Sequence, residues 1–268
     1  MAIDSFKKVI WEAGLITEFR KSSVAELIST KPVKTDGSKV TFNRLTTGDV
    51  KDYNGNIEWD KITTTPIDLV FDKKKYFAIT MDDLDAVQAV KSVMQDTIAD
   101  EAAKIKEQED KDFFATLVAG AGDTIGKTKA IVLNAKNVYD NIVDLGTKLT
   151  KKKVPKVNRY VVVSADITNL LSKDDRFTKN PNVLENGIVE GQKINGLQVV
   201  ESEELPEGTM IAVHKSGSGF GRQLQETEAM RLQNAFADGV RGLDAYGSIV
   251  LRKEAVVALK YTLEPAQA

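Results

Sequence analysis

A glycine-rich stretch at residues 216–221 is the part of the sequence whose composition most suggests a binding site. Glycines in a loop let backbone N–H groups approach a phosphate, provided that the loop follows a strand and opens a helix. Here another strand is expected to follow, so the context of a dinucleotide-binding fingerprint is missing. We therefore interpret residues 216–221 as a flexible turn, in which Gly217 should tolerate a side chain.

Residues able to act as catalysts or metal ligands are scarce. His214 is the only histidine, and the chain contains no cysteine. One imidazole cannot build a multi-histidine metal site, and the lack of thiols excludes thiolate ligands, thiol nucleophiles and disulfides. No serine lies in a nucleophile-elbow context, and Glu203 and Glu204 are interpreted as exposed loop acids. We therefore predict no catalytic, cofactor-binding or metal-binding residue and no enzymatic activity.

Two groups of like charge are explained by helix electrostatics. Asp82, Asp83 and Asp85 could suggest a cation site, but the helix dipole favours acids in the first turn of a helix. Residues 151–153 are three lysines that could contact nucleic acid. A basic run without interleaved aromatic residues is more typical of the C-terminal end of a helix. Both groups are therefore interpreted as helix ends.

Composition is that of an ordinary folded protein. Of the 268 residues, 42% are hydrophobic and 28% are charged, and the formal net charge is −2. The chain can form one large domain or two ordinary ones, and its bulk charge does not favour binding to a phosphate backbone. No apolar run approaches the roughly 20 residues that cross a bilayer, and the start of the chain, with Asp4, does not resemble a signal peptide. The lack of cysteine fits a reducing cytoplasm, so we expect a soluble intracellular protein.

The strongest local pattern predicts a long amphipathic helix. Thr80 is a candidate N-cap, and apolar residues then recur from Leu84 through Ile98 to Leu117 with a period close to 3.6 residues. No glycine or proline interrupts the pattern before Gly120. A helix of about 38 residues would be roughly 57 Å long, which exceeds the core of a compact domain of this size. The pattern predicts a spine whose apolar face, including Ile98, is buried.

The segments before this helix lack the apolar residues for a core of their own. Residues 5–30 carry irregularly spaced apolar residues and end at Lys31-Pro32, which predicts an arm with short helical pieces that packs on something else. Residues 39–80 have the pattern of two strands joined by an Asn-Gly turn at 53–56. Two strands alone are marginal in water, so this β-loop is expected to lie on another surface.

A central α/β pattern follows the helix, and a β segment closes the chain. The closing strands are expected at residues 224–232 and 248–259, with a glycine-rich joint at Gly239, Gly242 and Gly247 between them. The predicted class is therefore α+β. The central elements are a helix at residues 135–149 with Asn134 as its cap, a buried strand at 159–164, a short helix at 167–171, and strands at 197–200 and 210–213.

This order of elements resembles the major capsid proteins of tailed bacteriophages, which have the Hong Kong 97-type fold. The stretch Val-Pro-Lys-Val-Asn-Arg-Tyr-Val-Val-Val-Ser at residues 154–164 is similar to the family's entry into its axial sheet. The stretch from Phe220-Gly221-Arg222 through residues 236–242 to 256–259 is similar to the closing strands. The resemblance covers almost the whole chain and implies the following division: an N-terminal arm at 1–38, an extension loop (β-hairpin) at 39–80, a peripheral domain at 81–130 and 224–268, and an axial domain at 131–223.

The resemblance also implies function, partners and location. Copies of the chain should assemble through pentamers and hexamers into an icosahedral shell that encloses double-stranded DNA without sequence-specific binding. The protein should be part of the virion, assemble in the cytoplasm of the host bacterium, and make no membrane contact. Separate scaffolding, portal and decoration proteins are candidate partners. Because the sequence begins at a methionine directly on the arm, a scaffold is expected to be a separate protein or absent.

Some relatives cross-link a loop lysine to an asparagine of a neighbouring subunit. Lys51, Lys61 and residues 73–75 offer lysines here, but nothing local identifies a partner, so no cross-link is predicted. Two other functions stay open at this point. An encapsulin-type nanocompartment uses the same fold, although the long arm and extended loop favour the phage form. A small-molecule α/β enzyme is the alternative from another class, and it lacks a catalytic set.

Overall fold

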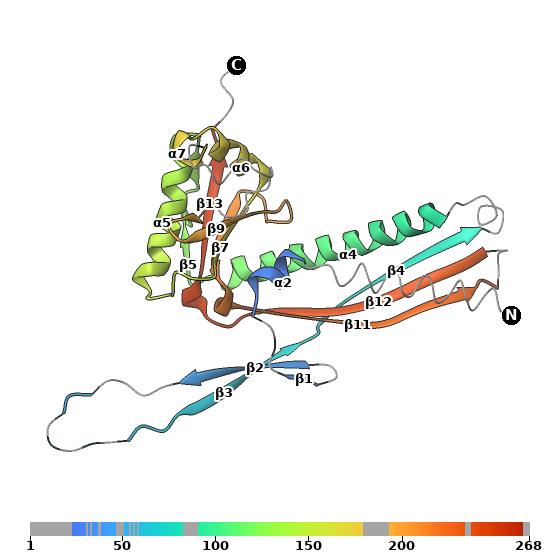
Figure 1. The fold of residues 1–268 in the computed structure, drawn as a ribbon, viewed down its shortest axis with the longest axis horizontal. Coiled ribbons are helices and arrows are strands. Elements are labelled where there is room, and N and C mark those ends of the chain that lie inside the picture. Colours follow the sequence, from blue (N-terminus) through green and yellow to red (C-terminus); the bar gives the residue numbers. More distant parts are fainter. Residues whose placement is uncertain are drawn as a thin grey trace.

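The computed structural model describes residues 23–30, 32, 34–36, 39–46, 51–53, 55, 57, 59–82, 91–178, 193–233 and 237–264. These residues form a compact α/β unit, a long sheet with one long helix along it, and a hairpin that projects from their junction (Figure 1). Among the described residues, no helix is both long enough and apolar enough to span a membrane.

The compact unit is built on a seven-stranded mixed sheet in the order β5-β13-β10-β7-β9-β8, with β6 paired to β13. Every residue of its two middle strands, β7 and β10, is buried, because the sheet is covered on both faces. One face packs on the first helix of this unit and the other on the end of the long helix. The strands are β5 (Asp123–Ile125), β6 (Ile131–Leu133), β7 (Arg159–Val163), β8 (Lys193–Ile194), β9 (Leu197–Glu201), β10 (Thr209–His214) and β13 (Val256–Leu263).

Three helices accompany this sheet: α5 (Val138–Lys151), α6 (Ala165–Ser172) and α7 (Asp175–Thr178). The two helices predicted at residues 135–149 and 167–171 are confirmed as α5 and α6, whereas α7 was not predicted. The N-cap of α5 is Asn137, not Asn134 as expected. The Asn134 side chain instead accepts hydrogen bonds from the backbone N–H groups of Lys136 and Asn137, so it closes the turn that precedes the helix.

The long helix, α4 (Lys91–Gly120), ends where the sequence predicts but does not start there. Its 30 residues correspond to a length of about 45 Å. Thr80 and Asp82 belong to the strand β4 (Lys73–Asp82), so neither lies at a helix N-terminus. Asp83 and Asp85 lie outside the described residues, and α4 is described at Ile98 only in its backbone.

The long sheet has three strands in the order β11-β12-β4, with β11 (Ser218–Arg231) and β12 (Ala237–Val250) antiparallel. The expected glycine joint is wrong, because Gly239, Gly242 and Gly247 all lie inside the 14-residue strand β12. Their φ angles are not positive. A strand at 248–259 is also wrong, since a 3-10 turn, η3 (Lys253–Ala255), separates β12 from β13.

The hairpin consists of β2 (Lys39–Thr46) and β3 (Thr63–Val70), with β1 (Lys34–Asp36) on the outer edge of β2. It leads away from both other parts of the molecule (Figure 1). The expected loop at residues 39–80 is therefore shorter than predicted, since 73–80 lie in β4 and pair with β12. Of the expected arm at 1–38, the structure describes a five-residue helix, α2 (Val24–Ile28), which packs on α4, and the strand β1, which pairs with the hairpin.

One expected domain assignment does not follow the observed sheets. The peripheral domain expected at 224–268 includes β13, but this strand lies between β10 and β5 in the seven-stranded sheet. The run Val-Val-Ala-Leu at its start is completely buried there, as a nearly continuous apolar strand requires burial on both faces. Residues 123–125, expected in the same domain, form β5 beside it.

Candidate assembly surfaces and the spine junction

The outer part of the hairpin exposes an unusual number of large apolar side chains. Tyr53, Ile57, Trp59 and Ile62 have exposed fractions of 77%, 62%, 89% and 72%. An ion pair of 2.8 Å between Lys51 Nζ and Asp60 Oδ1 joins the two sides of the hairpin at this level. Clusters of exposed apolar residues mark surfaces that bind another molecule, so this hairpin end is a candidate contact surface.

The base of the hairpin is fixed to the long sheet by a small apolar cluster. Val40, Phe42, Leu69 and Phe71 are buried together against Ala245 of β12. This cluster fits closely because glycines of the sheet lie beneath it. A Cβ atom added to Gly219 would lie 2.8 Å from the Phe42 ring, and one added to Gly221 would lie 3.1 Å from both Leu69 and Phe71.

The interpretation of residues 216–221 as a flexible turn is therefore wrong. Gly217 is buried in a 3-10 turn, η2 (Lys215–Gly217), and β11 begins directly after it. A Cβ atom at Gly217 would approach Ala255 Cβ to 3.0 Å. These glycines provide space for packing between elements, a role that local sequence cannot reveal.

Helix α4 and strand β12 meet in a regular ladder of contacts. Tyr246 Oη donates a hydrogen bond of 2.6 Å to Asp112 Oδ2, and Ser248 Oγ lies 2.9 Å from Thr116 Oγ1. Four residues of a helix span about 6 Å along its axis, and two residues of a strand span about 6.6 Å. Every fourth residue of α4 can therefore contact every second residue of β12. The ladder ends at Gly120, where an added Cβ would lie 2.5 Å from Val250 Cγ2.

At its other end the ladder leads to a buried charge cluster. Glu109 of α4 and Asp244 of β12 are both fully buried, and their carboxyl groups face one another. Arg222 of β11 places Nη1 3.4 Å from Glu109 Oε2 and Nη2 2.8 Å from Glu26 Oε1 of α2. Burial raises the pKa of Glu109 to about 9 and also raises the pKa of Asp244.

Asp110, beside this cluster, holds the start of α2 on the spine helix. Its carboxylate accepts hydrogen bonds from the backbone N–H groups of Val24 and Ala25 at 3.2 and 2.8 Å. Burial raises the pKa of Asp110 to about 6. Ala25 and Ile28 of α2 are fully buried, and they lie in the same apolar cluster as Phe113 and Phe114 of α4.

The residues considered as catalytic from the sequence have structural roles in this fold. His214 is buried, and its Nδ1 accepts a hydrogen bond from the backbone N–H of Ser216; burial lowers its pKa. Glu203 is not merely an exposed acid, because its Oε1 accepts a hydrogen bond of 2.5 Å from the N–H of Ala165 at the start of α6. Glu204 is partly buried.

The predicted basic run ends α5, as expected. Lys151 is its last residue, and Lys152 is its C-cap. Lys152 also lines an open pocket of about 550 Å³ between the end of α4 and the β12–β13 connection. The other lining residues are Gly122, Val250, Leu251, Lys253 and Glu254.

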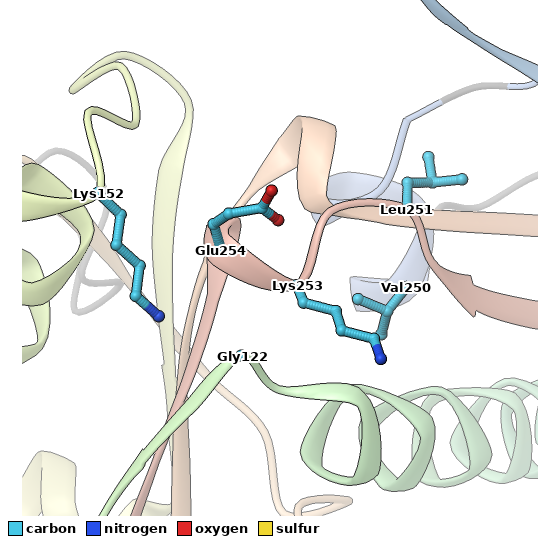
Figure 2. A pocket seen from close by; sticks show the side chains of 6 residues that line it. All are labelled: Gly122, Lys152, Val250, Leu251, Lys253 and Glu254. Atoms are coloured by element: carbon cyan, nitrogen blue, oxygen red, sulfur yellow. The ribbon is translucent and has the colours of Figure 1, made fainter. Parts of the chain in front are cut away.

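Figure 2 shows that the charged ends of Lys152, Lys253 and Glu254 do not point toward one another. Within the described ranges, no three histidine or acidic side chains are placed to hold a metal ion. The pocket therefore offers no convergent set of ligands.

The buried cluster is the feature that sequence reasoning missed, although one signal was present. Ile105 and Phe113 lie on the buried face of α4, and Glu109 lies midway between them at four-residue spacing. Residues four apart share a helix face. An acid on an apolar stripe indicates a buried charge, but Arg222 and Asp244 come from distant strands that no local pattern connects to it.

Comparison with known proteins gives the family context. A family model described as phage capsid protein matches residues 66–259. A solved structure from Mycobacterium phage Che8 is 29% identical, with a TM-score of 0.67, and the match covers 84% of this chain and 85% of that one. No curated protein sequence matches.

More distant structures share the fold. The capsid of cyanophage P-SCSP1u is 14% identical, with a TM-score of 0.63 and coverage of 91% and 90%. A virus-like particle from Pyrococcus furiosus is 12% identical, with a TM-score of 0.59 and coverage of 95% and 99%. The α+β architecture predicted from the sequence is therefore that of solved capsid structures.

Proposed function

Since this chain belongs to the phage capsid protein family, we propose that its copies assemble through pentamers and hexamers into an icosahedral shell that encloses double-stranded DNA. As a major capsid protein, it is a structural component of the virion. The proposal includes assembly in the cytoplasm of the host bacterium. Because the net charge is −2, contact with DNA would be weak and independent of sequence.

The observation that carries the proposal is the hairpin, which is fixed at its base and apolar at its far end. Its base is buried against Ala245, while Trp59 at the other end is 89% exposed. A small sheet with so little cover is marginal by itself. In the proposed shell, the exposed end packs on a neighbouring subunit and gains the burial that its own subunit does not supply.

The remaining elements suit a shell subunit. We assign the hairpin β2–β3 to the extension loop, the sheet β11-β12-β4 with α4 to a peripheral domain, and the seven-stranded unit to an axial domain. The ladder between α4 and β12 makes the peripheral part a stiff rod. A stiff rod joined to a compact unit can repeat in rings and curved sheets that close by rotation.

The alternatives have less support. A nanocompartment of the encapsulin type is not favoured, because the family model that matches is that of phage capsids. An enzyme would need a convergent set of catalytic groups, and none is predicted from the sequence. We therefore propose a purely structural role. Scaffolding, portal and decoration proteins stay candidate partners.

Hydrogen exchange tests the hairpin contact directly. Backbone amides of residues 43–46 and 63–65, at the outer end of the paired strands, should exchange quickly in unassembled subunits and slowly in shells. Strands β7 and β10 are the internal control, since both are buried within the subunit and should be protected equally in the two states. Equal protection of the hairpin in both states would contradict the proposed contact.

A further inference from the structure

Among the described residues, the buried cluster at the spine junction contains more acidic groups than basic ones. Three carboxyl groups, from Glu26, Glu109 and Asp244, surround the guanidinium of Arg222. Glu109 and Asp244 are fully buried, whereas Arg222 retains a little exposure. Full ionisation would leave excess negative charge away from water, which is strongly unfavourable.

Several buried carboxyl oxygens in this cluster have no hydrogen-bond donor, which indicates that one of the carboxyl groups is protonated. Among the described residues, Glu109 Oε1 and both carboxylate oxygens of Asp244 are buried without a hydrogen-bond donor. Two facing carboxylates cannot both be ionised at close range, and one proton between them supplies the missing donor. The strand β11 also has a bulge between Leu224 and Glu226, opposite Asp244, so the sheet is irregular at this point.

The same cluster is linked directly to the arm. Arg222 is shared between Glu109 of the spine helix and Glu26 of α2. The neighbouring Asp110 accepts hydrogen bonds from the first N–H groups of α2, and α2 lies across this part of α4 (Figure 1). Water can therefore reach the buried carboxyls most easily when α2 lifts away.

We propose that Glu109 and Asp244 share one proton, and that this proton, acting through Arg222, controls whether α2 stays seated on the spine helix. With the proton present, Arg222 keeps its ion pair with Glu26. When the proton is lost, the two buried carboxylates compete for Arg222 and need water. Lifting α2 supplies that water and separates Glu26 from the cluster.

The direction of the pH dependence follows from linkage. Burial raises the pKa of Glu109 from its ordinary value to about 9, so the seated state binds the proton more tightly than an open state. The packing of α2 on α4 is therefore most stable at low pH. This stability is lost as the pH rises through the raised pKa of Glu109.

Other charged groups face the cluster from each element packed against it, so the test must leave these groups unchanged. They are Asp110 and Asp112 of α4, Tyr246 of β12, Lys73 of β4, which lies 3.8 Å from Asp112, and Glu204, which acts on Asp110. A variant that changes only Glu109 leaves all of these groups in place. It therefore isolates the proposed proton.

Thiol labelling of the full chain tests the proposal, because the chain has no cysteine of its own. Ala25→Cys places one thiol on the buried face of α2, and Leu27→Cys places one on its exposed face. The ratio of their labelling rates with iodoacetamide reports lifting of α2. Between about pH 7 and about pH 10 this ratio should rise about tenfold or more, and Glu109→Gln, which mimics the protonated acid, should abolish the rise.

Two results would overturn the proposal: a ratio that does not change with pH, or the same rise in the Glu109→Gln background. If Glu109→Gln does not fold, infrared spectroscopy of the parent chain replaces it. A protonated carboxyl band should persist at about pH 7 and disappear above about pH 9. Complete ionisation at about pH 7 would equally refute the shared proton. The labelling rates report the packing of α2 within one subunit, so the result does not depend on whether shells form.

Discussion

Gly242 of β12 offers a sharp test of the packing in the long sheet. A Cβ atom at this position would lie 2.2 Å from Phe77 Cε1 and 2.5 Å from Phe77 Cζ, whereas ordinary van der Waals contact begins at 3.4 Å. Phe77 is only 6% exposed, so its ring has little room to move. Gly242→Ala should therefore destabilise the subunit by about 1–3 kcal/mol through overpacking, and Gly242→Val by more.

Gly239 provides a matched control in the same strand. Its nearest neighbour would be Leu232 Cδ2 at 3.2 Å, the end of a flexible side chain. Alanine is intrinsically better than glycine within a strand, so Gly239→Ala should cost less than about 0.5 kcal/mol. The assay is the urea midpoint of the unassembled subunit, with the denaturant slope checked for constancy.

A double-mutant cycle identifies the cause. Phe77→Ala removes the ring and should itself cost about 3–5 kcal/mol. In that background Gly242→Ala should be nearly neutral, which gives a coupling energy of about 1–3 kcal/mol. Equal losses for Gly239→Ala and Gly242→Ala, or an undiminished loss in the Phe77→Ala background, would refute the packing argument.

Three further changes test other parts of the fold. Leu117→Ala should cost about 2–5 kcal/mol because the side chain is fully buried, while Lys104→Ala on the exposed face should leave the urea midpoint almost unchanged. Similar losses for the two variants would contradict the assignment of the buried face of α4. Arg159→Met should cost at least about 2 kcal/mol, because the buried guanidinium donates to three backbone carbonyls and a threonine hydroxyl; a neutral result would mean that water replaces it. Glu203→Ala should cost about 0.5–1 kcal/mol by removing the cap of α6, and the exposed Glu207→Ala is its control; equal effects would exclude the cap.

The sequence predicted elements well where local pattern and tertiary packing agree. The end of α4 at Gly120 is an example, because glycine ends a helical pattern and is also needed for the close approach of Val250. The buried strand β7 and the helix α5 were likewise predicted, since apolar runs and a 3.6-residue period are local features.

The errors occurred where distant pairing overrides local preference. Thr80 has the chemistry of a helix cap, but it pairs with Gly239 in the long sheet. The glycines of β12 suggest a flexible joint, yet they make room for neighbours such as the Phe77 ring. Both facts depend on which strands become neighbours, and one sequence does not contain that information locally.

The candidate assembly features were predictable only in part. The projecting β-loop could be predicted from its polar strands and Asn-Gly turn, although its base cluster with Ala245 could not. The charge cluster of Glu109, Arg222 and Asp244 combines one helix with two strands. Only the position of Glu109 on an apolar stripe pointed to it.

Electron microscopy of the purified protein, combined with light scattering, tests the central claim most directly. A shell protein should form closed spherical particles, or rings of five and six subunits, under at least some concentrations and salts. Variants with a damaged hairpin base should form fewer of them while the compact unit stays folded. A strictly monomeric protein at every concentration and salt tested would contradict the proposed role.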